Sequence, residues 1–291
     1  MNDINKIVMD IFEENQKPDY KSDISFIKKI KKMLRFMISG YIFRYKKDSS
    51  KAKRLNVFNS TNNVYKNEKI CIYTVCIGKY DSIKNPIYYD ENIDYYIFTD
   101  QEISNDLIWK KINIKNIQKI SGLSLVEKTR YVKMHPEEFF SDYSYSVYID
   151  SNVRVACDIK PLVYSLIDSG KFMGLYEHPS RNCVYQEAKA IYAVGKSKLK
   201  YIRPQIKQYK SEGFPKKFGL FENNIIIRRH NDYKCIEIMN AWWNELLKYK
   251  SKRDQLCLVY CLWKHNFSFS DVFSLGNNSR KNPYFIVKAH S

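Results

Sequence analysis

Residues 145–154 read YSVYIDSNVR, an apolar run that ends at Asp150-Ser151-Asn152 and then resumes. The apolar part is typical of a buried strand. Asp, Ser and Asn are common turn formers, so a plain turn is one interpretation of the polar tip. A divalent cation site is the other, because Asp150 and Asn152 both offer the oxygen ligands that Mg²⁺ and Mn²⁺ prefer. The surrounding sequence has to separate the two interpretations.

Apolar runs of strand length alternate with helical patterns on both sides of this stretch. Strands are predicted at 69–77, 94–100, 107–114, 144–150, 171–178 and 223–229. Helices are predicted within 123–140, 159–167, 183–196, 235–249 and 255–265. This order predicts an α/β domain with a mostly parallel sheet flanked by helices. Ligands of such sheets bind beyond the carboxyl ends of the strands, where Asp100 and Asp150 fall.

Residues 1–68 differ from residues 69–291 and are predicted to be a basic helical extension with a polar connector. They hold 15 Lys or Arg against 8 Asp or Glu. Apolar residues recur at helical spacing from Phe26 to Tyr41, with lysines mostly on the opposite side. Two interpretations stay open: residues 24–47 lie on an anionic membrane surface, or the helix packs on the main domain.

The charge and the cysteines limit the class of protein. A formal net charge of +18 predicts an anionic partner, which can be nucleic acid, an acidic membrane or a phosphorylated substrate. The basic residues are spread out and form no known nucleic-acid module, so we expect no nucleic-acid partner, and a basic nucleic-acid-binding protein is an alternative. Seven cysteines without CxxC spacing predict reduced thiols and a cytoplasmic protein. If residues 24–47 lie on a membrane surface, the expected location is peripheral, at the inner face of the cell membrane.

An ordered set of segments carries a family resemblance. The set is TVCIGKYDS (74–82), FTD (98–100), KTRYVKMHP (128–136), YSVYIDSNVRV (145–155), ENNIIIRR (222–229) and RDQ (253–255). Over about residues 69–290, it resembles nucleotide-sugar-dependent glycosyltransferases of the GT-A fold. The chain is most similar to a glycosyltransferase-like family of bacteria and plants formerly catalogued as a domain of unknown function. That family looks distantly related to glycogenin and the lipopolysaccharide galactosyltransferases.

The resemblance implies roles for particular residues. Nucleotide-sugar contacts are implied for Thr74, Tyr80, Asp100, Lys128, Arg130, Asp150, Asn223, Asn224 and Gln255, and the first strand and its loop, which hold the nucleotide in such enzymes, also include Cys76 and Asp81. Catalytic roles are implied for Arg130, Glu187 and Asp254, and acceptor contacts for His178 and Arg181. The implied metal ligands, for Mn²⁺ or Mg²⁺, are Asp150, Asn152 and His290.

Several of these assignments have a structural alternative. Asn152 stands where such enzymes usually have a second aspartate, and the lost charge weakens metal binding. Asp254 also suits a helix N-cap. His178, Arg181 and Glu187 also suit a helix start with a solvated face.

The resemblance implies transfer of a sugar from a nucleoside diphosphate sugar, a UDP-sugar first of all, with retention of the anomeric configuration. The basic helix suggests a glycan or lipid-linked acceptor at a cytoplasmic membrane face, as in cell-surface polysaccharide biosynthesis. The alternative is a degenerate transferase fold that has lost its metal and its activity.

Overall fold

The computed structural model describes residues 68–78 and 81–288, together with positions 30, 31, 34, 35, 37 and 65. The described chain forms a seven-stranded sheet with the order β3-β2-β1-β4-β7-β6-β8 and a two-stranded ribbon, β5-β9. The strands are β1 (Ile70–Cys76), β2 (Asp94–Thr99), β3 (Lys110–Asn113), β4 (Tyr145–Ile149), β5 (Val153–Val155), β6 (Met173–Glu177), β7 (Phe221–Arg228), β8 (Phe273–Ser274) and β9 (Phe285–Val287). The predicted α/β fold with a mostly parallel sheet is confirmed.

One strand of the large sheet is reversed. β1 pairs in parallel with β2 and β4, and β2 pairs in parallel with β3. β7 runs antiparallel to both of its neighbours, β4 and β6. The start of β7 therefore lies at the edge where β1, β2 and β4 end.

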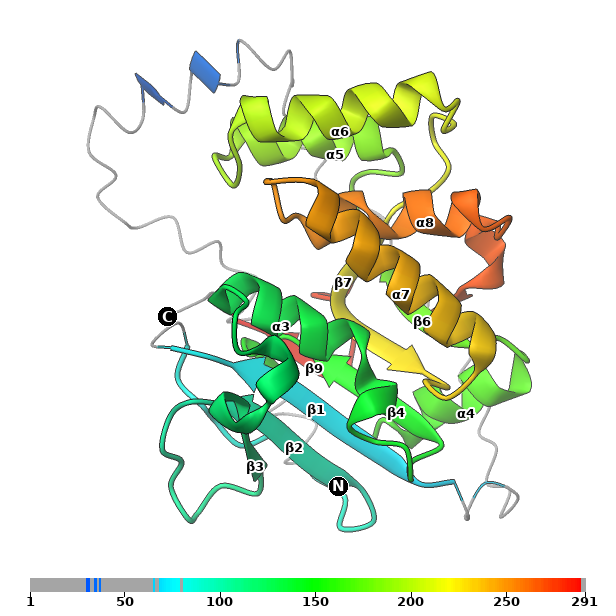
Figure 1. Cartoon of the computed structure of the whole chain (residues 1–291). Coiled ribbons are helices and arrows are strands. Elements are labelled where there is room, and N and C mark those ends of the chain that lie inside the picture. The colour runs from blue at the N-terminus through cyan, green and yellow to red at the C-terminus, as the bar shows by residue number, and fades with distance from the viewer. Residues whose placement is uncertain are drawn as a thin grey trace.

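Helices cover both faces of the sheet (Figure 1). The α-helices are α3 (Leu125–Met134), α4 (Lys160–Asp168), α5 (Val184–Ala193), α6 (Leu199–Ser211), α7 (Tyr233–Lys248) and α8 (Leu258–Lys264). Residues of α3, α7 and α8 share one buried cluster with alternate residues of β1, such as Tyr73. The other alternate residues, such as Ile72, share a second cluster with α4, β5 and β9. Because every residue of β1 is buried, its run is apolar on both faces.

Helix α3 shows how local sequence sets an element's limits. The Ser124 hydroxyl and the Glu127 carboxylate form a capping box at its start. The helix ends at Met134, and Pro136 begins a separate 3-10 turn, Pro136–Glu138. The predicted helix region 123–140 therefore holds a shorter helix, since a proline disfavours helical geometry in the residue before it.

Several elements were not predicted. β5, β8 and β9 have three, two and three residues, too few for a periodic signal. Helix α6 carries Pro204 inside it and a largely polar sequence. The sequence also gave no sign that β7 is reversed.

The described positions of the N-terminal region agree with the predicted helix. Positions 30, 31, 34, 35 and 37 are helical, and the rest of residues 24–47 lies outside the described residues. All seven cysteines are free, as expected. None of the helices in the described part of the chain has the length and apolar character that crossing a membrane requires.

Candidate active site

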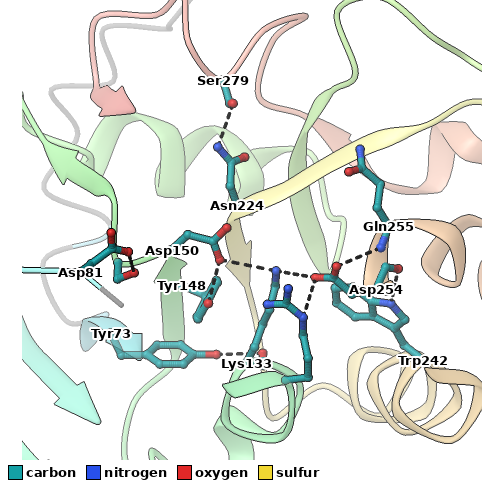
Figure 2. A network of polar contacts seen from close by, with 12 residues as sticks. Tyr73, Asp81, Lys133, Tyr148, Asp150, Asn224, Trp242, Asp254, Gln255 and Ser279 are labelled. Atoms are coloured by element: carbon teal, nitrogen blue, oxygen red, sulfur yellow. Dashed lines mark hydrogen bonds and ion pairs between the residues drawn. The ribbon is translucent and has the colours of Figure 1, made fainter. Parts of the chain in front are cut away.

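Three segments bring polar side chains to one edge of the sheet. Asp150 follows the last residue of β4, and Asn224 lies near the start of the reversed strand β7. The Asp150 amide donates to the Asn224 carbonyl at 2.8 Å. The 3-10 turn η5 (Asp254–Leu256) adds Asp254 from beyond α7. Figure 2 shows Asp150 and Asp254 converging on one lysine.

Lys133 of α3 lies between the two carboxylates. Its Nζ is 2.9 Å from Asp254 Oδ2 and 3.7 Å from Asp150 Oδ1, and its side chain is 1% exposed. The same Nζ lies 4.9 Å from the centroid of the Tyr148 ring and 5.8 Å from that of Trp242. A buried charge costs several kcal/mol unless it is paired. The two carboxylates and the two rings provide the compensation that a buried ammonium requires.

The backbone at Lys133 is held from the sheet. The Tyr73 hydroxyl in β1 donates to the Lys133 carbonyl at 3.0 Å, and Arg228 Nη1 in β7 donates to it at 2.8 Å. Arg228 is fully buried. The last turn of α3 is therefore fixed against β1 and β7, which sets the position of the Lys133 ammonium.

Asp254 is the more deeply buried carboxylate of the pair. Trp242 Nε1 donates to its carbonyl at 2.9 Å, and Arg130 Nε lies 3.3 Å from its Oδ2. Burial by itself would raise the pKa of Asp254, but the charges of Arg130 and Lys133 outweigh burial and hold the pKa well below its usual range. Asp254 is therefore an anion at neutral pH and a poor acceptor of protons.

The loop after β1 lies beside the Asp150 tip. Gly78 has φ of +68°, which favours glycine, and its amide donates to Asp100 Oδ1 at 2.8 Å. The Ser151 hydroxyl donates to an Asp81 carboxylate oxygen. Asp100 and Asp81 thus both hold this loop at the strand ends. The Asp100 carboxylate has a structural partner in addition to its predicted nucleotide contact.

The side chain of Asn152 faces the C-terminal part of the chain. Its Nδ2 donates to the Lys288 carbonyl at 2.6 Å, and the Lys288 amide donates to the Asn152 carbonyl at 2.9 Å. This pairing extends the β5-β9 ribbon. Next to it is a cavity of about 80 Å³, lined by Asp81, Ser82, Lys84, Ser151, Asn152, Arg154 and Lys288.

The donor atoms at this tip fit a divalent ion poorly. Asp150 Oδ1 accepts from the Tyr148 hydroxyl at 2.8 Å and is the same oxygen that Lys133 approaches. Within residues 68–78 and 81–288, no group of three or more His, Cys, Asp or Glu side chains could hold a metal ion. The third ligand predicted from the sequence, His290, lies outside the described residues.

A second cluster lies between the end of β6 and the start of α5. Arg181 Nε donates to a carboxylate oxygen of Glu187, which is 5% exposed. His178 Nε2 lies 3.7 Å from Glu187 Oε2. His178 Nδ1 accepts from the amides of Ser180 and Arg181, each at 3.1 Å. Arg181 Nη2 lies 2.8 Å from His178 Nε2. Both ring nitrogens of His178 therefore face donors, which disfavours a second proton on the ring. The predicted residues His178, Arg181 and Glu187 are therefore brought together.

The pKa of His178 predicts a dependence of stability on pH. Burial and the Arg181 charge lower this pKa to about 3, from 6.5. Because the unfolded chain binds the proton at a higher pH than the folded protein, this contribution to stability is complete above pH 6.5 and declines as pH falls toward 3.

The variant His178→Asn keeps an acceptor for the two amides and removes the titration. Urea unfolding at pH 7 and pH 4.5 should show that the variant loses about 2 kcal/mol less than wild type across this interval. An identical loss in both proteins would contradict the assignment.

Further cations adjoin the second cluster. Burial lowers the pKa of Lys196, and the charges of Arg253, Arg280 and Arg181 lower it further, so these groups are within electrostatic reach of one another. Arg253 also acts on Asp254, which joins the two clusters. The Nε of Arg253 is buried and has no hydrogen-bond partner among the described residues.

The remaining predicted residues are placed as follows. Asn224 Nδ2 donates to the Ser279 hydroxyl at 3.0 Å, and Gln255 Nε2 donates to the Phe221 carbonyl at 3.1 Å. The Asn223 amide is buried, and neither its oxygen nor its nitrogen has a partner in the described chain. Thr74 is buried within β1, Lys128 is half-buried on α3, and Tyr80 lies outside the described residues.

Tyr148 and Arg253 are the site residues to which sequence reasoning gave no role. Lys133 was expected, with Lys128 and Arg130, to lie on a helix from which these cations could neutralise phosphate oxygens, but its contacts with two carboxylates were not predicted. A signal was present for Lys133, because it lies one helical turn from Arg130 and so shares its face. It also stands between Val132 and Met134, in the turn of α3 that is buried.

A larger cavity, of about 490 Å³, lies between α7 and α8 and includes none of the predicted site residues. Its charged groups are already paired, Glu237 with His265 and Glu245 with Lys248. The strand-end cluster is therefore the better candidate, since its cations exceed its anions.

Comparisons with known proteins bear on the resemblance. Residues 31–283 match the family described as "TOD1/MUCI70, glycosyltransferase-like domain", which confirms the predicted likeness and extends it toward the N-terminus. No curated protein matches this chain.

Solved structures of glycosyltransferases are similar at low identity. The apo structure of the bifunctional glycosyltransferase WbbM is 13% identical with a TM-score of 0.43, over 74% of this chain and 40% of that one. The galactosyltransferase LgtC, in complex with donor and acceptor sugar analogues, is 12% identical with a TM-score of 0.40, over 70% of this chain and 72% of that one. The mannosyltransferase Ktr4p from S. cerevisiae, in complex with GDP, is 13% identical with a TM-score of 0.40, over 92% of this chain and 83% of that one. This chain therefore spans less than half of the WbbM chain.

Proposed function

This chain belongs to the family described as "TOD1/MUCI70, glycosyltransferase-like domain", and we propose that it is a glycosyltransferase whose donor is a nucleoside diphosphate sugar, with UDP as the first nucleotide to test. We propose a glycan or lipid-linked acceptor in cell-surface polysaccharide biosynthesis. The observation that carries the proposal is the Asp150–Lys133–Asp254 arrangement, joined by Arg130, at the carboxyl ends of β1, β2 and β4.

The chemistry explains why this arrangement suits sugar transfer. The bond between the anomeric carbon and the diphosphate oxygen breaks, and its electron pair stays on the diphosphate. Lys133 and Arg130 stabilise the charge that develops there. The acceptor hydroxyl oxygen bonds to the anomeric carbon, and its proton passes to the departing diphosphate. We propose that Asp254 and Gln255 contact hydroxyl groups of the donor sugar.

We propose retention of the anomeric configuration. An inverting reaction needs a base, and the two candidates are Asp254 and Glu187. Asp254 is a poor proton acceptor because of its lowered pKa. Glu187 is already paired with Arg181 and faces His178. These pairings favour a route in which the leaving diphosphate takes the proton.

The first test is ligand binding followed by turnover. Isothermal calorimetry with UDP, GDP and ADP should detect one nucleoside diphosphate with a dissociation constant below the millimolar range. The corresponding sugar nucleotide should then be consumed in the presence of acceptor extracts. If none of these nucleotides binds, the proposed donor class is wrong.

We also propose a cytoplasmic enzyme that is held peripherally at an anionic membrane face by residues 24–47. In the described part of this region, Ile30, Leu34 and Met37 are 39%, 47% and 71% exposed and lie one turn apart on one helical face. Arg35 lies against the domain, since a Cβ built on Gly195 would be 2.1 Å from its Nη1. One side of the helix thus contacts the domain while an apolar side stays exposed.

Deleting residues 1–48 tests this membrane proposal. The full chain should sediment with vesicles containing anionic lipid, whereas the deletion variant should stay in the supernatant, because the exposed apolar side and the basic residues are both lost. Neutral vesicles provide the control for charge. Equal sedimentation of the two proteins would remove the proposed anchor.

A further inference from the structure

The candidate site holds more positive than negative side chains. Its carboxylates are Asp150, Asp254 and Glu187, and its cations are Arg130, Lys133, Arg181, Lys196, Arg253 and Arg280. The cations of these two clusters therefore outnumber their carboxylates by three. Beside the Asp150 tip lie two further carboxylates, Asp81 and Asp100, and the cavity that Asp81 lines adds three more cations, Lys84, Arg154 and Lys288. A bound diphosphate carries about two to three negative charges at neutral pH, in keeping with the ordinary second pKa of a phosphate near 6. The surplus is of the size needed to neutralise it.

The innermost of these cations is fixed by the fold. Lys133 reaches both carboxylates, lies against two aromatic rings, and has its backbone carbonyl held by Tyr73 and Arg228. A fixed charge of this kind needs no reorganisation when charge develops on the leaving group. It also repels a dication, because two positive charges a few ångströms apart in a partly buried site raise each other's energy by several kcal/mol.

Asn152, which would complete a metal site at this tip, already has another hydrogen-bond partner. Asn152 gives its amide nitrogen to the Lys288 carbonyl and carries no negative charge. Among the described residues, the carboxylates at this tip are Asp150, whose Oδ1 already receives the Tyr148 hydroxyl, and Asp81, which accepts from the Ser151 hydroxyl. Asp254 is paired with Lys133, and Glu187 with Arg181.

We propose that this glycosyltransferase works without a bound divalent ion, and that Lys133 and the surplus cations around it, Arg253 foremost, neutralise the donor diphosphate. This inference rests on the proposed donor class. It differs from the usual arrangement in that the protein's own side chains carry all of the compensating charge.

Nucleotide binding with and without metal tests the inference, with the full-length protein. The dissociation constant for UDP and for GDP is measured by calorimetry in EDTA, in Mn²⁺ and in Mg²⁺. For the nucleotide that binds, we expect the three values to agree within about twofold. Transfer in EDTA should likewise agree with transfer in Mn²⁺ within about twofold. A tenfold or larger gain in affinity on adding Mn²⁺, or loss of transfer in EDTA, would overturn the inference.

Two variants make the result sharper. Asn152→Asp restores a second carboxylate and should acquire a Mn²⁺-dependent gain in nucleotide affinity that wild type lacks. Arg253→Met should weaken nucleotide binding in EDTA by tenfold or more. If Arg253→Met binds as wild type does, Arg253 has been assigned wrongly and the surplus charge is not used. Absence of nucleotide binding under every condition would instead reject the proposed donor class itself, and the inference with it.

Discussion

Lys133→Met is expected to lower the free energy of unfolding by about 3–5 kcal/mol, the cost of breaking a buried ion pair by removing one partner. The methionine fills a similar volume, so the loss comes from charge rather than from a cavity. Asp254 would keep Arg130 at 3.3 Å but lose the ammonium at 2.9 Å in a buried site. Urea unfolding followed by circular dichroism measures the change.

Two further variants test whether the loss of stability comes from the buried ion pair or from removing a lysine in general. Lys110 pairs with Asp94 on the surface, with side chains 57% and 40% exposed, so Lys110→Met should cost at most about 1 kcal/mol. Combining Lys133→Met with Asp254→Asn should recover part of the stability, because the amide no longer requires a cation. If Lys133→Met lowers the free energy of unfolding no more than Lys110→Met does, the buried ion pair between Lys133 and Asp254 does not stabilise the protein as proposed.

Asp150→Ala is expected to reduce turnover by about 10²-fold or more while the protein remains folded. Asp150 is one of the two carboxylates that position the Lys133 ammonium, and it accepts the Tyr148 hydroxyl. Losing it lets Lys133 move toward Asp254, and a misplacement of about 1 Å in a catalytic group costs on the order of 10²-fold in rate. The Asp150 side chain is 29% exposed, which is why the fold should tolerate the change.

The measurement is steady-state turnover of the sugar nucleotide identified by the binding screen, together with thermal unfolding. Asp142→Ala is the matched control, because Asp142 is exposed and lies in the turn just before β4. Asp142→Ala should leave turnover within about twofold of wild type and the free energy of unfolding within about 0.5 kcal/mol of it. Full activity in Asp150→Ala would remove Asp150 from the site.

Much of the fold was readable from the sequence. The apolar runs that became β1, β2, β4 and β7 are each long enough to show burial on both faces, and the helical periods of α3, α5 and α7 are clear. The strands β5, β8 and β9 were not predicted, because two or three residues are too few to show a periodic pattern. Helix α6 escaped because it contains Pro204. The direction of β7 was not predicted, because a strand that is buried on both faces has the same apolar sequence pattern whether it pairs in parallel or antiparallel.

The candidate site was readable in part. The segments that hold Asp150, Asp254, Arg130 and Glu187 stood out because carboxylates and arginines interrupt or flank apolar runs. Asn152 drew attention as a departure from the usual pattern, yet only its contact with the Lys288 carbonyl showed where its amide is directed. The sequence grouped Lys133 with Lys128 and Arg130 as cations that could neutralise phosphate oxygens, and only the structure showed that Lys133 lies between two carboxylates.

The sequence by itself therefore determined the α/β architecture, the likeness to a glycosyltransferase-like family, and the strand ends as the place for chemistry. Those properties depend on local periodicity and on residue types, which the chain carries in linear order. The tertiary structure decided which cation matters most, because Lys133 and Asp254 are 121 positions apart and meet only when α3 packs against α7 and η5. The tertiary structure also decided which cation neutralises Asp150 in YSVYIDSNVR, because the distance between Asp150 and Lys133 is set only when the chain folds.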